Sequence, residues 1–369
     1  MSTNQTLLLP RWLLSMKPGE GVLTDQAVLL EGERIAAVGN AETLSLQHPG
    51  AQRVNLPEHV LLPGLINAHT HSAMSLLRGV ADDLGLMDWL NKHIWPLEKR
   101  WVSHAWTRLG SLFSAAEALR GGVTTLNDMY FFPKAMAEAA LEAGIRCAVS
   151  INVIDFPTGY ASGPDDYIAK GVEAYREFKG EPLLQFTSSP HAPYTVSDAS
   201  FVKLRELAER EAMQMHCHIH ETLDEVNGSL KEHGVRPLER LDRLGLLNER
   251  MIAVHMVHLT DGEIELLARR GVHIAHNASS NLKLASGICR VADLDAINFL
   301  AEKALATLQM GSVVDGIVRT VVPFGAFVDV GGVEGLVPLS EMSHNRADGP
   351  RDIFKVNETC RVKILRVDE

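Results

Sequence analysis

The chain has 369 residues, of which 46% are hydrophobic and 22% are charged. This length indicates two or three domains, and this composition is typical of a folded globular protein, so a peptide, a fibrous chain and a mostly disordered chain are excluded. The net charge of −11 argues against a surface that binds nucleic acid everywhere, and four cysteines without a Cys-x-x-Cys pair indicate neither a disulfide framework nor a thiolate zinc site.

The N-terminal apolar stretch, residues 7–16, is interrupted by Pro10 and Arg11 and has no small-residue cleavage site. No run of about 18 apolar residues occurs elsewhere in the sequence. We therefore expect neither export nor a membrane span, and the few cysteines fit a reducing cytoplasm.

Residues 27–38 predict two short strands joined by a turn at Glu31-Gly32-Glu33, as part of a small β layer whose other strands are not evident.

Seven segments rich in Val, Ile and Leu follow, and stretches with helical spacing separate them. This is the pattern of βα units that build a parallel sheet. The predicted strands are residues 60–69, 124–130, 146–154, 183–191, 213–221, 251–259 and 272–280. Helices such as 105–120 and 200–212 lie between them. No eighth strand is evident, so the fold class that we expect is α/β with an incomplete (β/α)8 barrel.

Histidines recur at the C-terminal ends of these strands. His69 and His71 are two residues apart at the end of the first strand, so their side chains point to the same face. The fourth, fifth and sixth strands carry further histidines, namely His191, His216, His218, His220, His255 and His258. Catalytic groups converge at this edge of a (β/α)8 barrel, and three neutral imidazoles plus an open position suit a catalytic Zn²⁺. For each histidine alone, a polar residue at a strand end or in the core is the alternative.

Six motifs around these residues are distinctive in combination. They are Leu-Pro-Gly-Leu-Ile-Asn-Ala-His-Thr-His at 62–71, Leu-Leu-Arg-Gly-Val-Ala-Asp-Asp at 76–83, Trp-Pro-Leu-Glu at 95–98, Ser-Pro-His-Ala-Pro-Tyr at 189–194, His-Ile-His-Glu-Thr at 218–222 and His-Asn-Ala-Ser-Ser-Asn-Leu-Lys-Leu at 276–284. Over about residues 20–295 the chain resembles the metal-dependent amidohydrolase superfamily, specifically the 5′-methylthioadenosine/S-adenosylhomocysteine deaminases and their chlorohydrolase relatives.

The resemblance implies that His69, His71 and His218 bind one zinc ion per chain. His216 and His220 share the strand parity of His218, and only the family's spacing of a histidine to the following Glu221 selects the middle one.

The resemblance also implies roles for four further residues. Glu221 moves a proton between the metal-bound water and the purine N1, and His255 orients that water. Glu98 and His191 contact the substrate, with Glu98 accepting hydrogen bonds from ribose hydroxyls. Without the resemblance, Glu98 is a solvated helix carboxylate and His191 is equally well a core histidine.

The implied reaction is hydrolytic deamination of an adenine nucleoside. The substrate is 5′-methylthioadenosine or S-adenosylhomocysteine, and the products are the corresponding inosine derivative and ammonia. A pyrimidine, a guanine or a chlorotriazine is the alternative substrate within the superfamily.

One part of the family's metal site has no counterpart in this sequence. The family places an aspartate at the end of the eighth strand, in a Gly-Thr-Asp-Gly type motif, whereas here the family pattern stops after Ala296. Loss of this ligand and base predicts weak zinc binding through three histidines and severely impaired deamination, because a missing general base costs about 10²–10⁴ in rate. An incomplete barrel also leaves unpaired strand edges.

The composition changes near residue 296. All five tryptophans lie before position 107, and the last tyrosine is Tyr194. Residues 312–318, 326–330, 335–338 and 359–367 predict short strands, with a turn at Gly331-Gly332, which suits an all-β OB fold, a five-stranded β-barrel. Residues 297–309 have helical spacing and lead into it. The amino-acid sequence at 311–318, 324–341 and 362–368 resembles the RNA-binding repeat of ribosomal protein S-one.

This second resemblance implies contacts to single-stranded RNA. Phe324 and Phe327 match the aromatic residues that stack on bases, and Lys363 and Arg366 match phosphate contacts. Pro338 stands where the family often has a histidine. Core packing is the alternative for Phe327, and a solvated strand face is the alternative for both basic residues. With eight Lys and Arg against ten Asp and Glu from residue 297 onward, a net of −2, we expect weak and salt-sensitive binding.

The sequence thus predicts three domains: a β-sandwich fragment over 1–58, the seven-strand barrel over 59–296 and the OB fold over 297–369. One hypothesis is a zinc deaminase with an appended RNA-binding repeat. The other is a catalytically dead fusion whose working part is the RNA-binding module. The abrupt change near Ala296 falls inside an expected βα unit, which is typical of a recombinant or artificial fusion rather than an evolved linker. The oligomeric state stays open.

Overall fold

The computed structural model describes residues 5–17, 19–81, 84–294, 313–322, 325–329, 334–338 and 354–363. The strands in this part of the chain form three sheets. Of the residues described, those within 1–67 and 116–126 form one compact unit and the others form a second. No helix in the described ranges is both long and apolar enough to cross a bilayer.

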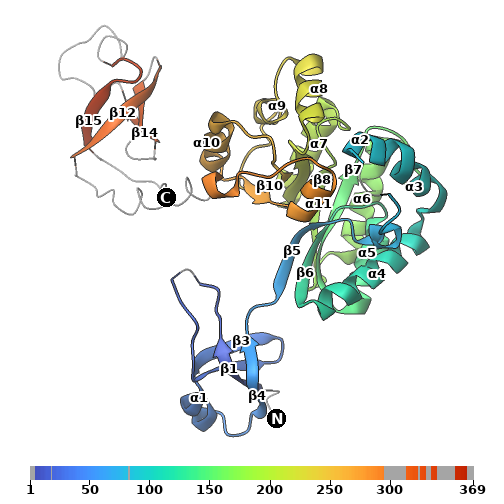
Figure 1. Ribbon diagram of the computed structural model, residues 1–369, viewed down its shortest axis with the longest axis vertical. Coiled ribbons are helices and arrows are strands. Elements are labelled where there is room, and N and C mark those ends of the chain that lie inside the picture. Colours follow the sequence, from blue (N-terminus) through green and yellow to red (C-terminus); the bar gives the residue numbers. More distant parts are fainter. Residues whose placement is uncertain are drawn as a thin grey trace. The chain divides into compact units, whose positions relative to one another are not determined.

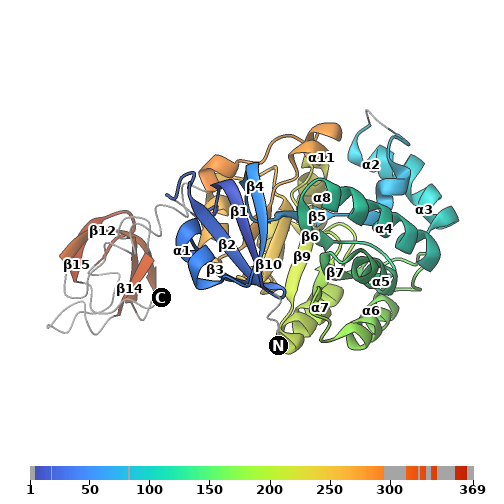
Figure 2. The ribbon, with the colours of Figure 1, turned by 90° about the horizontal axis from the view of Figure 1, so that it is seen from below.

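The first sheet has four strands in the order β3-β2-β1-β4. They are β1 (Gln5–Leu13), β2 (Gln26–Glu31), β3 (Arg34–Asn40) and β4 (Gln52–Leu61), drawn side by side in Figure 2. β2 and β3 pair antiparallel across a turn in which Gly32 has a φ of 59°, which confirms the predicted hairpin. The other strands of this sheet, which were not evident from the sequence, are β1, antiparallel to β2, and β4, parallel to β1. Helix α1 (Ala41–Gln47) covers a core of Leu7, Ala27, Leu29, Leu44 and Ala51.

The second sheet is a nearly closed parallel barrel of seven strands in chain order (Figure 1). They are β5 (Leu65–Thr70), β6 (Val123–Asp128), β7 (Arg146–Val153), β8 (Leu184–Pro190), β9 (Gln214–Ile219), β10 (Met251–His255) and β11 (His273–Ala275). In the described residues no eighth strand joins this sheet, so β5 and β11 lie at its two ends. The predicted incomplete barrel is therefore confirmed.

Helices cover the outside of the barrel. α5 (Pro133–Ala143) and α6 (Pro164–Phe178) pack on β7, and α7 (Asp198–Glu211) packs on β8 and β9. α8 (Leu223–His233), α9 (Pro237–Arg243) and α10 (Asp261–Arg269) follow the later strands. Capping residues define where these helices begin: the Ser197 side chain accepts from the Ser200 N–H, and Thr260 forms a capping box with Glu263.

In the described residues, four short helices and the longer α4 connect β5 to β6, and one more short helix follows β11. They are η1 (Ser72–Leu77), α2 (Leu86–Trp89), η2 (Leu90–Ile94), α3 (Trp95–Trp101), α4 (His104–Arg120) and α11 (Ala278–Lys283). α4 lies against η1 without room for a side chain at Gly110, where a Cβ would be 2.4 Å from the carbonyl oxygen of Ala73. This close approach fixes η1, which directly follows His71.

Three predicted strands have wrong boundaries. The segment 251–259 is a strand only over Met251–His255, because the chain turns with positive φ at His255 and Met256. The segment 60–69 is divided, because β4 ends at Leu61 and β5 begins at Leu65; Pro63 between them has no N–H for a ladder bond. The segment 272–280 is a strand only over His273–Ala275, and α11 follows, since its Ala, Leu and Lys residues favour a helix.

The third sheet is antiparallel, in the order β14-β13-β12-β15. Its strands are β12 (Val313–Val322), β13 (Gly325–Asp329), β14 (Glu334–Pro338) and β15 (Thr359–Lys363). Val318, Ala326 and Val328 form its buried core. These strands overlap the four predicted ones. The predicted helix 297–309, the turn at Gly331-Gly332, Phe324 and Arg366 lie outside the described residues, and the domain boundaries at 58 and 296 stay predictions.

Candidate metal centre and active site

Four imidazoles meet at the C-terminal edge of the barrel strands. His69 belongs to β5, His71 follows it, His218 belongs to β9 and His255 ends β10. The ring centroids of His69 lie 4.7 Å from those of His71 and 4.8 Å from those of His218, and His71 and His218 are 5.2 Å apart. The structure therefore brings together the three histidines predicted as metal ligands.

His255 joins this group more closely than the sequence suggested. One possible ligand atom from each of His69, His218 and His255 lies within 4.8 Å of the others. The chain leaves β10 with positive φ values at His255 (75°) and Met256 (49°), an uncommon conformation for residues with side chains. This turn lies directly at the cluster.

Three of the four rings are held through Nδ1 by an oxygen atom. His71 Nδ1 lies 2.5 Å from the carbonyl oxygen of Met129, and His218 Nδ1 lies 2.8 Å from that of His191. His255 Nδ1 lies 2.7 Å from Asn281 Oδ1. Because carbonyl oxygens only accept hydrogen bonds, each Nδ1 carries the hydrogen and each Nε2 keeps a lone pair. Such anchoring is how proteins orient imidazoles that bind metals.

The fourth ring, His69, is held differently. Its Nδ1 lies 2.9 Å from Nε2 of His216, and its Nε2 lies 3.1 Å from Nε2 of His218. His216 is fully buried. The sequence left His216 as an alternative ligand, whereas the structure places it behind His69.

Removal from water keeps these imidazoles neutral. Burial, and then the neighbouring imidazoles, lower the pKa of His69 and His218 well below the ordinary value. Burial lowers the pKa of His255 to about 4, partly opposed by its hydrogen bond to Asn281. Uncharged nitrogens with lone pairs fit a divalent metal ion that prefers imidazole ligands.

Glu221 lies beside this cluster, after the end of β9. Its Oε1 is 3.5 Å from His255 Nε2, and burial followed by the charge of Glu225 raises its pKa to about 8. Glu225 accepts hydrogen bonds from the backbone N–H of His220 (2.9 Å) and of Glu221 (2.8 Å). Glu221 therefore holds a proton near neutral pH, in a backbone position that Glu225 fixes.

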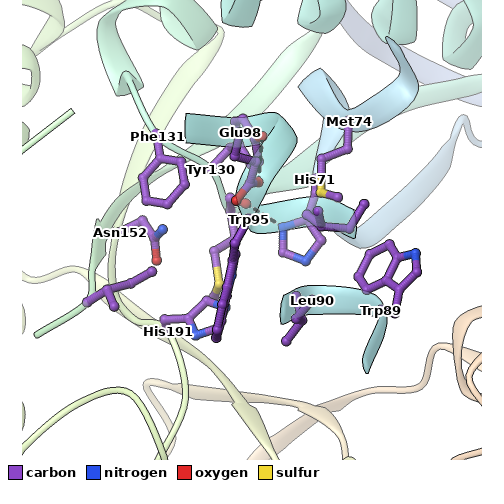
Figure 3. A pocket seen from close by; sticks show the side chains of 13 residues that line it. His71, Met74, Trp89, Leu90, Trp95, Glu98, Tyr130, Phe131, Asn152 and His191 are labelled. Carbon is purple, nitrogen blue, oxygen red and sulfur yellow. Dashed lines mark hydrogen bonds between the residues drawn. The ribbon is translucent and has the colours of Figure 1, made fainter. Parts of the chain in front are cut away.

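A pocket opens next to His71 (Figure 3). Glu98 from α3 and Tyr130, which follows β6, form its polar part, and Tyr130 Oη donates to Glu98 Oε1 at 2.7 Å. Burial raises the pKa of Glu98 to about 7, and the hydrogen bond from Tyr130 opposes this shift. The remaining wall is mostly apolar and aromatic. It includes Met74, Trp89, Leu90, Ile94, Trp95, Phe131 and Ile154.

His191 connects the pocket to the metal cluster. Its ring lines the pocket, and its centroid is 4.9 Å from that of His218. Thr195 Oγ1 lies 2.9 Å from its Nδ1, and burial lowers its pKa to about 3. Arg240 holds the loop that follows, donating to the carbonyls of Pro193 (2.7 Å) and Val196 (3.0 Å).

Three residues at this site were missed from the sequence. Tyr130 pairs with Glu98, and Asn281 holds His255. Asp128 accepts a hydrogen bond from the backbone N–H of Ser72 (2.6 Å), immediately after His71, and one from the Ser72 hydroxyl. Asp128 and Tyr130 follow the same rule as the histidines, since they stand at the C-terminal end of a barrel strand. That position was the signal that could have found them.

Two of the four predicted RNA contacts lie in the described residues. Phe327 is half-buried between the fully buried Ala326 and Val328, so strand alternation turns its ring to the face opposite the core. Lys363 is exposed in β15.

Comparisons with known proteins give three family matches. The Amidohydrolase family matches residues 60–313, the S1 RNA binding domain matches residues 307–369, and a bacterial imidazolonepropionase-like composite domain matches residues 27–51. The S1 domain lies at the C-terminal side of the chain, as its motifs predicted.

Curated relatives match the first of these regions. The chain is 41% identical over 293 residues to the 5-methylthioadenosine/S-adenosylhomocysteine deaminase of Saccharophagus degradans, covering 78% of this chain and 66% of that protein. It is 43% identical over 278 residues to the 5′-deoxyadenosine deaminase of Methanopyrus kandleri, covering 74% and 64%. The chain thus spans just under two thirds of the length of these relatives.

Solved structures share the same fold. An adenosine deaminase from Xanthomonas campestris with bound zinc is 44% identical, with a TM-score of 0.76, over 79% of this chain and 66% of that one. A guanine deaminase from C. acetobutylicum with bound guanine is 19% identical, with a TM-score of 0.73, over 80% and 72%. The second likeness concerns the fold alone.

Proposed function

This chain belongs to the amidohydrolase family, and from that premise we propose that its barrel is a zinc-dependent hydrolase that deaminates adenine nucleosides. The observation that carries this proposal is the convergence of His69, His71, His218 and His255 beside the buried Glu221. Three of these imidazoles are anchored through Nδ1, so their Nε2 lone pairs are available. The relatives that act on methylthioadenosine, S-adenosylhomocysteine or deoxyadenosine support this substrate class.

The residues of the cluster fit zinc, because neutral imidazoles are its usual nitrogen ligands. We propose His69, His71 and His218 as ligands, with His255 next to them. A zinc ion at such a site supplies water with a pKa near neutrality, so that hydroxide is available for attack on C6 of the purine.

The side chains of this chain supply the remaining steps. Glu221, whose pKa is raised to about 8, gives its proton to N1 of the purine as the C6–O bond forms. His255, 3.5 Å from Glu221, orients the attacking water. The hydroxyl group now on C6 then gives up its proton to the amino group, the C6–N bond breaks, and ammonia leaves as C6 becomes a carbonyl carbon.

The pocket beside His71 suits the nucleoside. Glu98, held by Tyr130, accepts hydrogen bonds from ribose hydroxyls, and His191 contacts the substrate between ribose and metal. The apolar wall formed by Met74, Trp89 and other residues suits a 5′ substituent without charge, such as a methylthio group. We therefore favour 5′-methylthioadenosine as the substrate to test first.

The rate is a separate part of the proposal. The sequence has no counterpart of the family's eighth-strand aspartate, so we infer a rate reduced by about 10²–10⁴ relative to complete family members. If deamination is absent altogether, the RNA-binding domain is the working part of the chain.

The test is ultraviolet monitoring of methylthioadenosine conversion by the purified, zinc-supplemented chain, with Glu221→Gln as the control. Slow turnover that the Gln variant abolishes supports the proposal. Turnover at a rate normal for such enzymes would refute the predicted impairment, and a folded, zinc-loaded sample without turnover would refute the deaminase activity.

The second candidate function is binding of single-stranded RNA by the S1 domain. The observation that favours it is Phe327, whose neighbours Ala326 and Val328 form the core while its ring faces the other side. We propose that Phe324 and Phe327 stack on bases and that Lys363 and Arg366 contact phosphates, at about 1–3 kcal/mol per stacked base.

Fluorescence anisotropy with a labelled single-stranded RNA tests this function. We expect Phe324→Ala with Phe327→Ala to weaken binding at least tenfold, and Lys363→Ala to reduce the salt dependence of binding. An RNA affinity that the double variant leaves unchanged would contradict the proposed contact surface.

A further inference from the structure

His216 is a buried, polar residue in the barrel that the proposed reaction does not use. It lies in β9 two residues before His218 and is fully buried. Its Nε2 lies 2.9 Å from His69 Nδ1, and the two rings meet edge to face at 76°, with centroids 4.9 Å apart. No described residue supplies a hydrogen-bond partner for its Nδ1. A buried imidazole nitrogen without a hydrogen-bond partner reduces the stability of the folded chain, so its presence calls for an explanation.

The contact differs in kind from those of the other cluster histidines. His71, His218 and His255 are held by oxygen atoms that only accept hydrogen bonds, so their Nδ1 atoms always donate. The Nε2 of a neutral histidine either donates or accepts, depending on the tautomer. His69 is therefore the one ring of the four whose hydrogen can move between its two nitrogens without loss of the supporting bond.

The neighbouring distances show why this freedom is needed. His218 donates from Nδ1 to the carbonyl of His191, so its Nε2 presents a lone pair to Nε2 of His69, 3.1 Å away. When no cation lies between these two atoms, His69 must carry its hydrogen on Nε2 to avoid two opposed lone pairs. Its Nδ1 then accepts a hydrogen bond from the Nε2–H of His216.

A bound divalent cation requires the opposite arrangement. The Nε2 atoms of both His69 and His218 must then offer lone pairs, so His69 carries its hydrogen on Nδ1 and donates to His216 Nε2. His216 carries its own hydrogen on Nδ1. Each ring has one hydrogen before and after, so the change is a double tautomer shift without net gain or loss of protons.

We propose that His216 is the positioning residue of His69, and that it changes from donor to acceptor when a divalent cation binds. The inference rests on the proposed function only in requiring that the cluster binds a divalent metal, not that deamination occurs. His216 thereby preserves the orientation of His69 in the metal-free and in the metal-bound protein.

Two substitutions of His216 test the proposal in the full chain. His216→Met fills similar space but provides no hydrogen bond, whereas His216→Gln offers an amide that can donate or accept near the same point. Zn²⁺ affinity is measured by competition with a chromophoric chelator, after removal of metal. We expect the Met variant to bind zinc about 10–100-fold more weakly than the unsubstituted chain and the Gln variant to recover most of this loss.

His220→Met is the matched control. His220 lies on the same side of the chain just after β9, is fully buried, and bonds to the backbone N–H of Leu238 rather than to a cluster histidine. We expect the control to lose stability while its zinc affinity stays within about twofold of the unsubstituted chain. Thermal unfolding of each metal-free variant, followed by circular dichroism, establishes that the samples compared are folded.

The outcomes separate the two proposals. If the unsubstituted chain binds no zinc, the metal site and this inference both fail. If it binds zinc and the folded Met variant binds equally well, or if the control loses as much affinity, the role of His216 is refuted while the metal site stands.

A measurement on the unsubstituted chain covers the case in which the Met variant does not fold. Long-range ¹⁵N–¹H spectra of the histidine-labelled protein distinguish the two tautomers. We expect the hydrogen of His216 to move from Nε2 to Nδ1 on addition of zinc. A His216 tautomer that is the same with and without bound zinc would overturn the proposal.

Discussion

At the scale of single residues, a buried amide controls the orientation of the histidine next to Glu221. Asn281 is fully buried in α11, and its Oδ1 lies 2.7 Å from Nδ1 of His255. This bond fixes the hydrogen of His255 on Nδ1 and turns Nε2 toward Glu221, 3.5 Å away. α11 thus contributes to the site although it follows β11, at the far end of the sheet from β5.

We expect Asn281→Ala to weaken zinc binding and any deamination about tenfold or more, because His255 would keep a buried N–H without an acceptor and could rotate. Asn281→Asp retains an acceptor at this position and should lose less. Chelator competition measures the zinc affinity, and the ultraviolet assay measures turnover. Equal values for the Ala variant and the unsubstituted chain would show that His255 is positioned by other contacts.

The sequence identified the residues that repeat a strand pattern but not those that pair across the fold. His69, His71, His218 and His255 could be named as candidates because they stand at the ends of predicted apolar strands, and the family resemblance then singled out His218 from its neighbours. Tyr130 could not, since its value lies in one contact to Glu98, 32 residues away, and a single polar residue has no periodic signal. The choice between ligand and support for His216 was likewise a matter of distance rather than spacing.

At the scale of elements, the contact between α4 and η1 determines where the chain continues after His71. Gly110 allows the two backbones to touch, and Asp128 accepts from the backbone N–H of Ser72 at the start of η1. One side of η1 is therefore fixed by backbone packing and its first residue by a buried carboxyl.

We expect Gly110→Ala to reduce the free energy of unfolding by about 1–3 kcal/mol, because the added Cβ would lie 2.4 Å from a backbone atom that cannot rotate away. Urea unfolding of the full chain measures this change. The matched control is Gly228→Ala in α8, where a Cβ meets nothing within 4 Å and should stabilise the helix by about 0.5–1 kcal/mol. Equal effects of both substitutions would contradict the close packing of α4 on η1.

Strands and helices could be predicted from the sequence where their hydrophobic pattern extends over many residues. Where that pattern is short, the predicted ends of the elements were wrong. β7 and β8 are buried throughout most of their length, and their apolar runs were found to within one residue. β11 has only three residues, so its pattern merged with that of α11. Pro63 interrupts an apolar run that periodicity alone reads as one strand.

At the scale of the whole molecule, buried ionisable groups make stability depend on pH in two opposing ways. Burial lowers the pKa of the cluster histidines and their neighbours, for example to about 3 in His216 and about 4 in His220. Burial raises the pKa of carboxyl groups, to about 6 in Asp128 and about 7 in Glu225. In the described residues, the buried histidines with a lowered pKa outnumber the buried carboxyl groups with a raised pKa.

We expect the metal-free chain to be most stable near pH 6.5. Below this pH the histidines of the unfolded chain take up protons, whereas the buried histidines of the folded chain stay neutral. The contribution of the histidines to the free energy of unfolding is therefore lost as pH falls. The raised carboxyl pKa values act in the opposite sense from about pH 4 upward: their contribution is complete below that pH and is lost as pH rises toward about 8. Below pH 6.5 the more numerous histidines outweigh this loss, and above pH 6.5 the carboxyl effect dominates.

Urea unfolding at pH 5, 6.5 and 8, followed by tryptophan fluorescence, measures this profile. All five tryptophans precede position 107, so the signal comes from the part of the chain before the S1 domain. Stability at pH 5 equal to that at pH 6.5 would show that the buried histidines take up protons in the folded chain.

The domain types could be predicted from local motifs, whereas the pairing of distant strands could not. The motifs of the barrel and of the S1 domain are short contiguous stretches of sequence. The family matches confirm both domain types. The parallel pairing of β1 with β4 joins Thr6 to Gln52 and has no local sequence signal. The partners of the predicted hairpin were therefore visible only in the structure.

The distance along the chain between the two halves of the histidine cluster sets a delay during synthesis. His69 and its support His216 are 147 residues apart, yet they touch. At about 5–20 residues per second, a ribosome needs about 7–30 s to add the second after the first. During that interval His69 and His71 are available to chaperones or to stray metal ions before the strand that completes their site exists.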